Sequence, residues 1–271
     1  MIQHHIGLDA THLAGNDGLG RVVVLPGSRA RAAAIGARFD ALTVVDNARG
    51  HTAHLGSLTR GGRRVDVLAI SSGMGAPSTE IVAHELLAVG ARRIVRVGSC
   101  GSLDPALRAG DIAILSGAVR DEMSSRHLAP VELPALAHPD AVAAMVAGAR
   151  AAGLADHAFV GMGHSKASLY AREFGMGPMA EENRAYMRLL ARCGVIASEM
   201  EASVLFVLAS AASAGRATSI AAGSLAVPVQ TACVLGVYAH HEDVGGLDPA
   251  LCALADVRAI DTALAGIFAW V

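Results

Sequence analysis

Short apolar runs alternate with helix-like segments along almost the whole chain, and this alternation limits the folds open to it. The clearest runs are RVVVLPG (21–27), RVDVLAI (64–70), RRIVRVG (92–98) and GDIAILSGAV (110–119), and a fifth is expected at 157–163. They are rich in valine and isoleucine, and the first three lead into glycine-containing turns, as buried strands do. The pattern predicts an α/β sheet with helices on both faces.

The segments between these runs carry helix signals. After 64–70 comes the small-residue loop SSGMGAPS, and a helix is expected from Pro77 to Gly90, with Glu80 near its positive end. No linker, repeat or domain boundary interrupts the chain, so residues 1–271 are predicted to form one domain. Further helices are expected at 139–152, 180–193, 200–214 and 248–269.

Composition excludes several classes of protein. The net charge is −2 and only 17% of residues are charged, so the chain lacks the polybasic surface that nucleic acid or anionic lipid would require. Aromatic residues are 3%, too few for a base-stacking platform. The four cysteines are widely spaced and form no CxxC pair, so neither a zinc site nor a disulfide framework is expected. They are Cys100, Cys193, Cys233 and Cys252.

One uncharged stretch, 217–239, is long enough to span a bilayer, but glycines, Pro228 and several hydroxyl residues interrupt it. We therefore expect a buried strand at 218–227 followed by a loop or helix. The N-terminus has no signal-peptide pattern, so a cytoplasmic protein is expected. The cluster His240-His241-Glu242-Asp243 lacks ligand spacing on one face and is interpreted as an exposed loop rather than a metal site.

Glycines and arginines gather at the predicted strand exits. Gly27 ends the first strand and Arg31 follows it, Arg96 and Ser99 flank Gly98, and Arg49 lies in the polar stretch DNARGH. Backbone N–H groups beside glycines, a hydroxyl and the guanidinium fork all suit phosphate oxygens. The alternative for any single arginine is a solvated surface group, but Arg96 lies inside an apolar strand, where a charge needs a partner or a ligand.

Three segments together resemble a known family. They are VVVLPGSRAR (22–31), the run from SSGMGAPS to SSRHLAP (71–130), and GVIASEMEASVLFVLAS (194–210). The chain resembles the nucleoside phosphorylases, most of all the uridine phosphorylases of the hexameric branch, from His5 to about Gly223. The resemblance implies a three-layer α/β/α fold with a central mixed sheet. It also implies a homo-oligomer with shared active sites, a hexamer built as a trimer of dimers.

The resemblance also implies roles for individual residues. The phosphate site would use Gly27, Arg31, Arg96 and Ser99, although GSRAR stands here where GDPxR is usual in the family. Arg49 and His5 would act from the neighbouring subunit, Arg49 on phosphate and His5 on the ribose 5′-hydroxyl. In the EMEA motif, Met200 would line the ribose and Glu201 would bind its 2′- and 3′-hydroxyls. Carboxylates before the apolar helix also complement its dipole, which explains one of them without a ligand.

By the same resemblance, residues 161–175 would form the base pocket. Lys166 is the only lysine among 22 basic residues. Its ammonium group could donate to a base carbonyl and stabilise charge on the departing base, whereas the alternative is a solvated surface lysine. Arg172 and Glu173 lie near the family's glutamine–arginine recognition pair, with a different spacing. The remaining base-binding candidates are Cys100, Gly101, Leu169 and Glu199.

The sequence departs from the family at Val227-Pro228, where an Asp or an Arg that contacts the base is usual. Three explanations stay open: the 164–173 segment recognises the base alone, Gln230 substitutes, or the substrate is not an ordinary uridine or purine nucleoside.

The predicted reaction is reversible phosphorolysis of a ribonucleoside to a free base and ribose 1-phosphate, with Arg96, Glu201 and Lys166 as catalytic residues and no metal or organic cofactor. The alternatives are a purine nucleoside phosphorylase, a nucleosidase that uses water, and a nucleoside-binding protein without catalysis.

Overall fold

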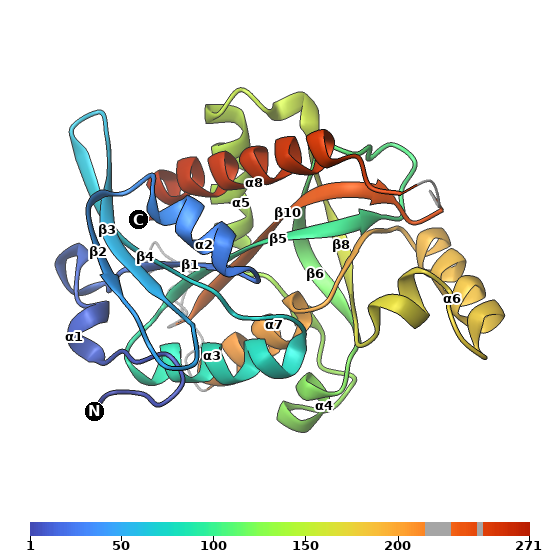
Figure 1. Ribbon diagram of the computed structural model, residues 1–271, viewed down its shortest axis with the longest axis horizontal. Helices are drawn as coiled ribbons and strands as arrows, with labels where there is room; N and C mark the ends of the chain where they lie inside the picture. The colour runs from blue at the N-terminus through green and yellow to red at the C-terminus, as the bar shows by residue number, and fades with distance from the viewer. Residues whose placement is uncertain (215–228, 243–245) are drawn as a thin grey trace, which may run out of the picture.

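A computed structural model describes residues 1–214, 229–242 and 246–271 of the chain (Figure 1). Its strands form one mixed sheet, because parallel and antiparallel pairs occur together. The strands are β1 (Val22–Pro26), β2 (Asp40–Val45), β3 (Ala53–Arg60), β4 (Arg63–Ile70), β5 (Arg93–Ser102), β6 (Ile112–Asp121), β7 (Ala135–Leu136), β8 (Ala158–Lys166), β9 (Val195–Glu199) and β10 (Gln230–His240).

Part of the sheet closes on itself. β5 pairs with β10 in parallel, β10 with β6, β6 with β8, β8 with β9, and β9 returns to β5 in antiparallel fashion, which completes a ring of strands. From β5 the sheet continues through β1, β4, β3 and β2 to an open edge. β5 therefore belongs to both the ring and the open part, and it is the strand on which the two halves of the sheet meet.

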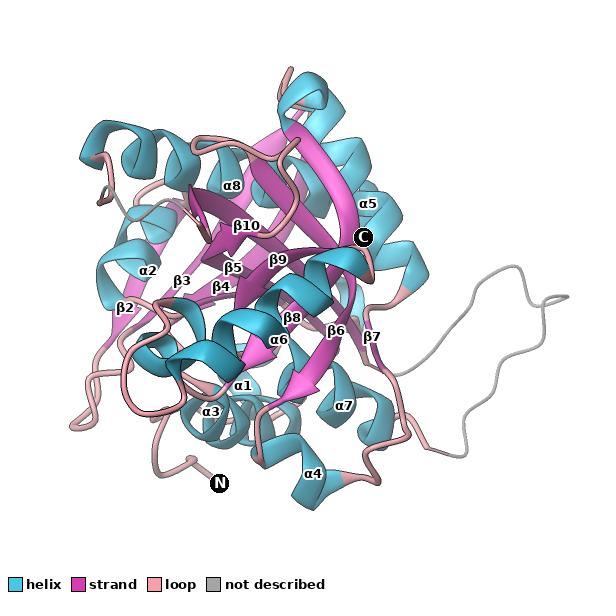
Figure 2. Ribbon diagram, turned by 90° about the vertical axis from the view of Figure 1, so that its right-hand side faces the viewer, coloured by secondary structure: helices cyan, strands magenta, loops and turns pink. Residues whose placement is uncertain are grey.

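Helices cover both faces of the sheet, as the sequence predicts (Figure 2). On one face α2, α5 and α8 bury Ile35, Met145 and Ile267 against β1, β4 and β10, and on the other α3 and α7 bury Leu86 and Leu205. The helices are α1 (Ala10–Leu13), α2 (Arg29–Gly36), α3 (Ala76–Ala88), α4 (Ser124–Leu128), α5 (Pro139–Ala151), α6 (Ala180–Arg192), α7 (Ala202–Ala212) and α8 (Pro249–Trp270).

Helix starts follow the local sequence signals. Ser28 caps α2 by accepting the backbone N–H of Arg31 at 3.0 Å, and Asp248 caps α8 directly before Pro249. The helix expected from Pro77 to Gly90 is α3, which begins one residue earlier and ends at Ala88. The helices expected at 139–152, 180–193, 200–214 and 248–269 correspond to α5, α6, α7 and α8.

Two predictions about strands were wrong. The expected loop or helix after residue 227 is β10, an interior strand whose residues from Gln230 to Val237 are buried on both faces. Such a run has no alternation of polar and apolar residues, so its periodicity cannot distinguish strand from helix. The second error concerns residues 98–101, which were expected to form a turn. They continue β5 instead, because β10 pairs with all of them and β9 pairs with Gly101. The strand predicted at 218–227 and Val227-Pro228 lie outside the described residues.

Within the described ranges, no helix is long and apolar enough to cross a membrane. In the same ranges, no group of three or more His, Cys, Asp or Glu side chains is arranged to hold a metal ion. His240 ends β10, and the following His241 and Glu242 form a turn.

α5 and α8 cross at unusually close range because glycine occupies the contact on each helix. A Cβ added to Gly148 of α5 would lie 2.5 Å from the backbone nitrogen of Gly266 in α8, and one added to Gly266 would lie 2.9 Å from the carbonyl oxygen of Ala144. Backbone atoms cannot rotate away as side chains can, so any larger residue must separate the helices.

We therefore expect Gly148→Ala to destabilise the fold by about 2–3 kcal/mol through overpacking, despite the better helix propensity of alanine. Urea unfolding measures this loss. The matched control is Ala143→Ser on the exposed side of the same helix, which should change stability by less than about 0.5 kcal/mol. Equal stability of Gly148→Ala and the wild type would contradict the close crossing.

Candidate active site

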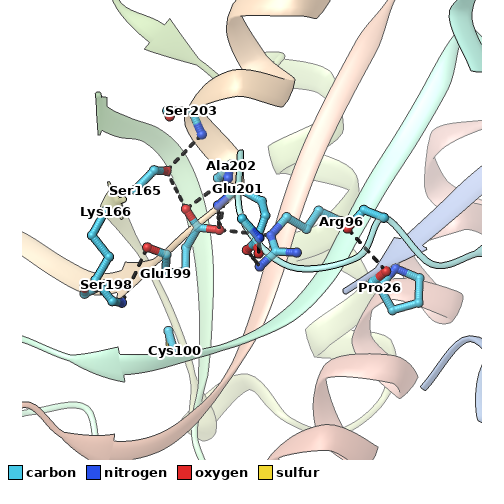
Figure 3. A network of polar contacts seen from close by, with 12 residues as sticks. Pro26, Arg96, Cys100, Ser165, Lys166, Ser198, Glu199, Glu201, Ala202 and Ser203 are labelled. Atoms are coloured by element: carbon cyan, nitrogen blue, oxygen red, sulfur yellow. Dashed lines mark hydrogen bonds and ion pairs between the residues drawn. The ribbon is translucent and has the colours of Figure 1, made fainter. Parts of the chain in front are cut away.

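The candidate site lies where β5 passes from its parallel partner β1 to its antiparallel partner β9. Arg96 is opposite Leu25 in the β1 pairing, and Gly101 is opposite Ser198 in the β9 pairing. The ends of β1, β8 and β9 and the start of α7 therefore meet around one strand. Figure 3 shows the resulting polar network, with Pro26 and Arg96 at one end and Lys166 and Ser198 at the other.

Arg96 is the centre of this network. Its Nε donates to Oε2 of Glu199 at 3.0 Å, and its Nη2 donates to Oε2 of Glu201. All three side chains are buried, with exposed fractions of 4%, 0% and 7%. Burial opposes the charge of Arg96, but Glu201 and Glu199 outweigh it and raise the pKa of the guanidinium above its usual value. The cation is therefore permanent and held in one orientation.

Glu199 connects Arg96 to the start of α7. Both of its oxygens accept the backbone N–H of Ala202 at 2.9 Å, one accepts that of Glu201, and the Ser165 hydroxyl donates to the other. Burial alone would raise the pKa of Glu199, but Arg96, Ser165 and these N–H groups outweigh it and lower the pKa. A carboxylate at a helix start is favourable, so Glu199 holds α7 and Arg96 together.

Glu201 faces the glycine loop after β4. Its Oε1 accepts the backbone N–H of Gly75 at 2.6 Å, while Oε2 accepts from Arg96. Burial raises the pKa of this carboxyl and the neighbouring charge of Glu199 adds to the effect, against the pull of Arg96. A carboxylate has about four lone-pair positions. Glu201 therefore keeps acceptor capacity for further donors such as sugar hydroxyls.

The end of the network beside β1 offers donors to an anion. Nη1 of Arg96 is buried and has no hydrogen-bond partner among the described residues. A Cβ added to Gly27 would lie 3.9 Å from this nitrogen and 3.2 Å from the carbonyl oxygen of Gly73. Gly27 thus leaves open the space in front of an unsatisfied guanidinium N–H. A buried unpaired donor is costly, which favours a ligand acceptor there.

Arg31 contacts two residues, Tyr238 of β10 and Asp256 of α8. Its Nη2 donates to the Tyr238 hydroxyl at 2.8 Å and to Oδ1 of Asp256 at 2.7 Å. The side chain of Ser99 also acts on the Tyr238 hydroxyl and lowers its pKa, against the larger effect of burial. Burial raises the pKa of Tyr238, which keeps the hydroxyl protonated. Arg31 is thus held by Tyr238, which sequence reasoning missed, and by Asp256, and its role towards phosphate stays a prediction.

Comparison with known proteins agrees with this geometry. Residues 21–224 match the family model described as the phosphorylase superfamily. The chain belongs to the phosphorylase superfamily. It is 34% identical to a uridine phosphorylase of Treponema pallidum over 210 residues, which are 77% of this chain and 76% of the relative. It is 30% identical to a uridine phosphorylase of Haemophilus influenzae over 211 residues, 76% of this chain and 80% of the relative. A DeoD-type purine nucleoside phosphorylase of Roseobacter denitrificans is 33% identical over 208 residues, again 76% and 80%.

Lys166 is the central residue at the end of the network that lies away from β1. Its ammonium group lies 2.8 Å from Oε2 of Glu173, donates to the Ser198 hydroxyl at 3.0 Å, and is only 3% exposed. The surface-lysine alternative was therefore wrong. β8 carries Lys166 into the sheet end, and a π-helical segment over Leu169–Glu173 folds back to supply its partner.

The remaining base-site candidates surround this ion pair. A Cβ on Gly101 would collide with Oε1 of Glu173, so the glycine allows that carboxylate to lie against β5. Cys100 is buried nearby, and burial together with the charge of Glu173 raises the pKa of its thiol far above the usual value, so the thiol stays protonated. Leu169 is 37% exposed at the margin. Arg172 instead binds Asp121, with Nε 2.8 Å from Oδ2.

Three predicted residues are not held by the Arg96 network within one chain. His5 pairs with Glu85 of α3, Nδ1 to Oε1 at 2.6 Å, and this contact lowers the pKa of Glu85 despite the opposing effect of burial. Arg49 is exposed, and its side chain makes no hydrogen bond or ion pair with the part of the chain that the structure describes. Met200 is half-buried at the turn between β9 and α7. The roles of His5 and Arg49 across an interface stay predictions.

Sequence reasoning missed the residues that hold the site residues in place. Ser165 and Ser198 bind the carboxylates of Glu199 and Glu173, and Tyr238 binds Arg31. Serines carry little signal on their own, because most are solvated. Tyr238 offered one clue, since it is a polar ring at the end of an apolar run.

Arg96→Met should destabilise the protein by about 3–5 kcal/mol at pH 7, because two buried carboxylates lose their cation. Without Arg96 the pKa of Glu201, already raised, rises further and that of Glu199 is no longer lowered by the guanidinium, so the folded variant binds protons more tightly than the wild type. Its deficit relative to the wild type should therefore shrink by about 1–2 kcal/mol as the pH falls from 7 to 5. Urea unfolding at both pH values measures this. Arg192→Met, an exposed position, is the control, and a deficit independent of pH would contradict the arrangement.

Proposed function

We propose that this protein catalyses reversible phosphorolysis of a ribonucleoside, uridine or a related pyrimidine nucleoside, to a free base and ribose 1-phosphate. The observation that carries the proposal is the buried Arg96, held by two carboxylates and left with one unsatisfied N–H in front of Gly27. Such a donor suits a phosphate oxygen, and the carboxylate of Glu201 beside it suits sugar hydroxyls. The similar proteins named uridine phosphorylase support the choice of reaction.

The proposed reaction uses the order of groups along the network. Phosphate binds beside Gly27, Ser99 and Arg96, below the sugar, and Glu201 fixes the ribose through its 2′- and 3′-hydroxyls while Met200 lines it. The glycosidic bond loosens to leave an oxocarbenium-like sugar, which phosphate attacks at C1′. Lys166 stabilises the negative charge that develops on the departing base. Phosphate is the co-substrate, and no organic cofactor takes part.

Charge balance explains why more than one arginine is needed. The two negative charges of Glu199 and Glu201 exceed the single positive charge of Arg96. A phosphate dianion that binds beside them therefore requires further cations. Arg31 is already paired with Asp256, whereas Arg49 is exposed and unpaired in the described chain. We therefore propose that Arg49 and His5 complete the site of a neighbouring subunit in a hexamer built as a trimer of dimers.

The reaction is tested by measuring base release from uridine, thymidine, inosine and adenosine, with and without inorganic phosphate. We expect release that depends on phosphate, with uridine the best substrate, and formation of ribose 1-phosphate. Release that is equally fast without phosphate would replace the proposal with a nucleosidase. Tight nucleoside binding without any release would replace it with a binding protein.

The shared site is tested by complementation. Arg49→Ala and Glu201→Gln variants should each lose roughly 10²-fold or more in kcat/KM, because each removes a charged hydrogen bond to a substrate. Subunits of the two variants, unfolded and refolded together, should recover about a quarter of wild-type activity, since half of the dimers are mixed and each has one intact site. The two homogeneous variants refolded separately are the controls. Absence of recovery in mixed oligomers would place Arg49 in its own chain's site.

A further inference from the structure

Arg31 is a buried guanidinium that is bound on one side only. Its side chain is 9% exposed, and Nη2 makes both of the hydrogen bonds that it forms with the part of the chain that the structure describes. Nε is buried and has no hydrogen-bond partner among the same residues. A buried N–H without an acceptor is costly, which favours a ligand acceptor beside it.

Two arginines with this property adjoin the turn that follows β1. Arg31 lies in the first turn of α2, directly after Gly27 and the capping Ser28, and the unpartnered Nη1 of Arg96 lies in front of the same glycine. The turn at which phosphate is proposed to bind is therefore bordered by two buried guanidinium groups, each with an unsatisfied N–H.

Tyr238 and Asp256 hold Arg31 in a closed triangle of hydrogen bonds. Nη2 of Arg31 donates to the Tyr238 hydroxyl at 2.8 Å and to Oδ1 of Asp256 at 2.7 Å, and the Tyr238 hydroxyl donates to the same Oδ1 at 2.8 Å. A hydroxyl has one proton, so this donation leaves the lone pairs of the tyrosine oxygen for Arg31. The directions of all three hydrogen bonds are thereby fixed.

Tyr238 and Asp256 lie on two tightly packed elements. Tyr238 of β10 is left out of the pairing register with β5, at an irregularity of the kind that re-aims a side chain. Asp256 belongs to α8, which packs so closely on β10 that a Cβ added to Gly236 would lie 2.7 Å from the carbonyl oxygen of Ala255. The backbone positions of both residues are therefore fixed relative to each other.

Asp256 balances the charge of Arg31 without using all of its donors. A ligand can still bind Nε, and also Nη1, which makes no hydrogen bond with the described residues. A free arginine side chain loses rotamer freedom when it binds a ligand, whereas one that is already held loses little. The triangle therefore presents preorganised donors to an anion.

We propose that Tyr238 and Asp256 are positioning residues that hold Arg31 ready for phosphate, and that they set the affinity for phosphate but not for the nucleoside. This inference rests on the proposed function, because it takes phosphate as the co-substrate. It adds a tyrosine and a carboxylate to the phosphate site, and both act on phosphate through Arg31 rather than by direct contact.

The first test measures the steady-state kinetics of Tyr238→Phe with the best nucleoside of the panel, varying phosphate and nucleoside in turn. The variant keeps the ring but loses the hydroxyl, so the KM for phosphate should rise about tenfold, because Arg31 loses one of its two partners. kcat and the KM for the nucleoside should stay within about twofold of the wild type. An unchanged KM for phosphate, or equal rises in both KM values, would overturn the inference.

Tyr186→Phe is the matched control for the loss of a hydroxyl. The Tyr186 hydroxyl makes no hydrogen bond with the described residues, so its removal should leave the KM for phosphate at the wild-type value.

Two variants of Asp256 separate its role as an acceptor from its charge. Asp256→Ala removes the acceptor shared by Arg31 and Tyr238 and should raise the KM for phosphate about tenfold. Asp256→Asn keeps Oδ1 as an acceptor and removes a negative charge, so its KM for phosphate should not exceed that of the wild type. Asp261→Asn, on the same helix, is the control. A lower KM in Asp256→Ala would show that Asp256 competes with phosphate for Arg31, and this result, or an equal rise in both variants, would contradict the proposal.

A double-mutant cycle decides whether Tyr238 acts through Arg31. In an Arg31→Met background the triangle no longer exists, so adding Tyr238→Phe should change the KM for phosphate by less than about twofold. A further tenfold rise in the double variant would mean that Tyr238 acts on phosphate independently, against the proposal.

Failure of the proposed reaction gives a different result. If base release does not depend on phosphate, or no nucleoside of the panel is cleaved, the proposed function fails. The inference is then decided by calorimetric titration of the wild type and Tyr238→Phe with inorganic phosphate. Binding to the wild type that is tighter by about fivefold or more would support the positioning role. Equal affinities, or no binding of phosphate to the wild type, would exclude it.

Discussion

The buried ion pairs of Arg96 with Glu199 and Glu201 are the constraint on which the candidate site depends. Placing three charges in the interior is costly unless each is matched, and here each partner is also bound to backbone: Glu199 to the start of α7, Glu201 to the glycine loop after β4. The ion pairs therefore join β5, β9, α7 and the 71–75 loop at one point. The positions of these four elements therefore depend on one another through the guanidinium group of Arg96.

From this centre the site extends in two directions with opposite chemistry. Towards β1 the available groups are donors, because Arg96 has an unsatisfied N–H and Gly27 leaves space before it. Towards β8 the available groups are a donor and an acceptor, Lys166 and Glu173. Glu201 lies between the two. In the proposed phosphorolysis, an anion, a polyhydroxyl sugar and a polar base would meet complementary groups in that order.

Much of this site could be predicted from the sequence, because the residues concerned are unusual in their surroundings. Arg96 is a charge inside an apolar strand and Lys166 is the single lysine, and both are buried. The serines and the tyrosine that hold the site residues in place could not be predicted. Ser165 and Ser198 are ordinary serines, and Tyr238 lies more than two hundred residues from Arg31. Such contacts depend on which strands become neighbours, and local patterns contain no information about that.

The sequence by itself determined the class of fold and the positions of most helices, because burial of apolar runs and helix-terminus signals are local properties. Only the tertiary structure decided that β5 continues past Gly98, that Gln230–His240 is a strand, and that β5, β10, β6, β8 and β9 close into a ring. The ring brings the ends of β8 and β9 against the far half of β5. The pairing of Glu173 with Lys166 follows from that closure, since hydrogen-bonded strand pairing is a long-range choice among many apolar runs of similar composition.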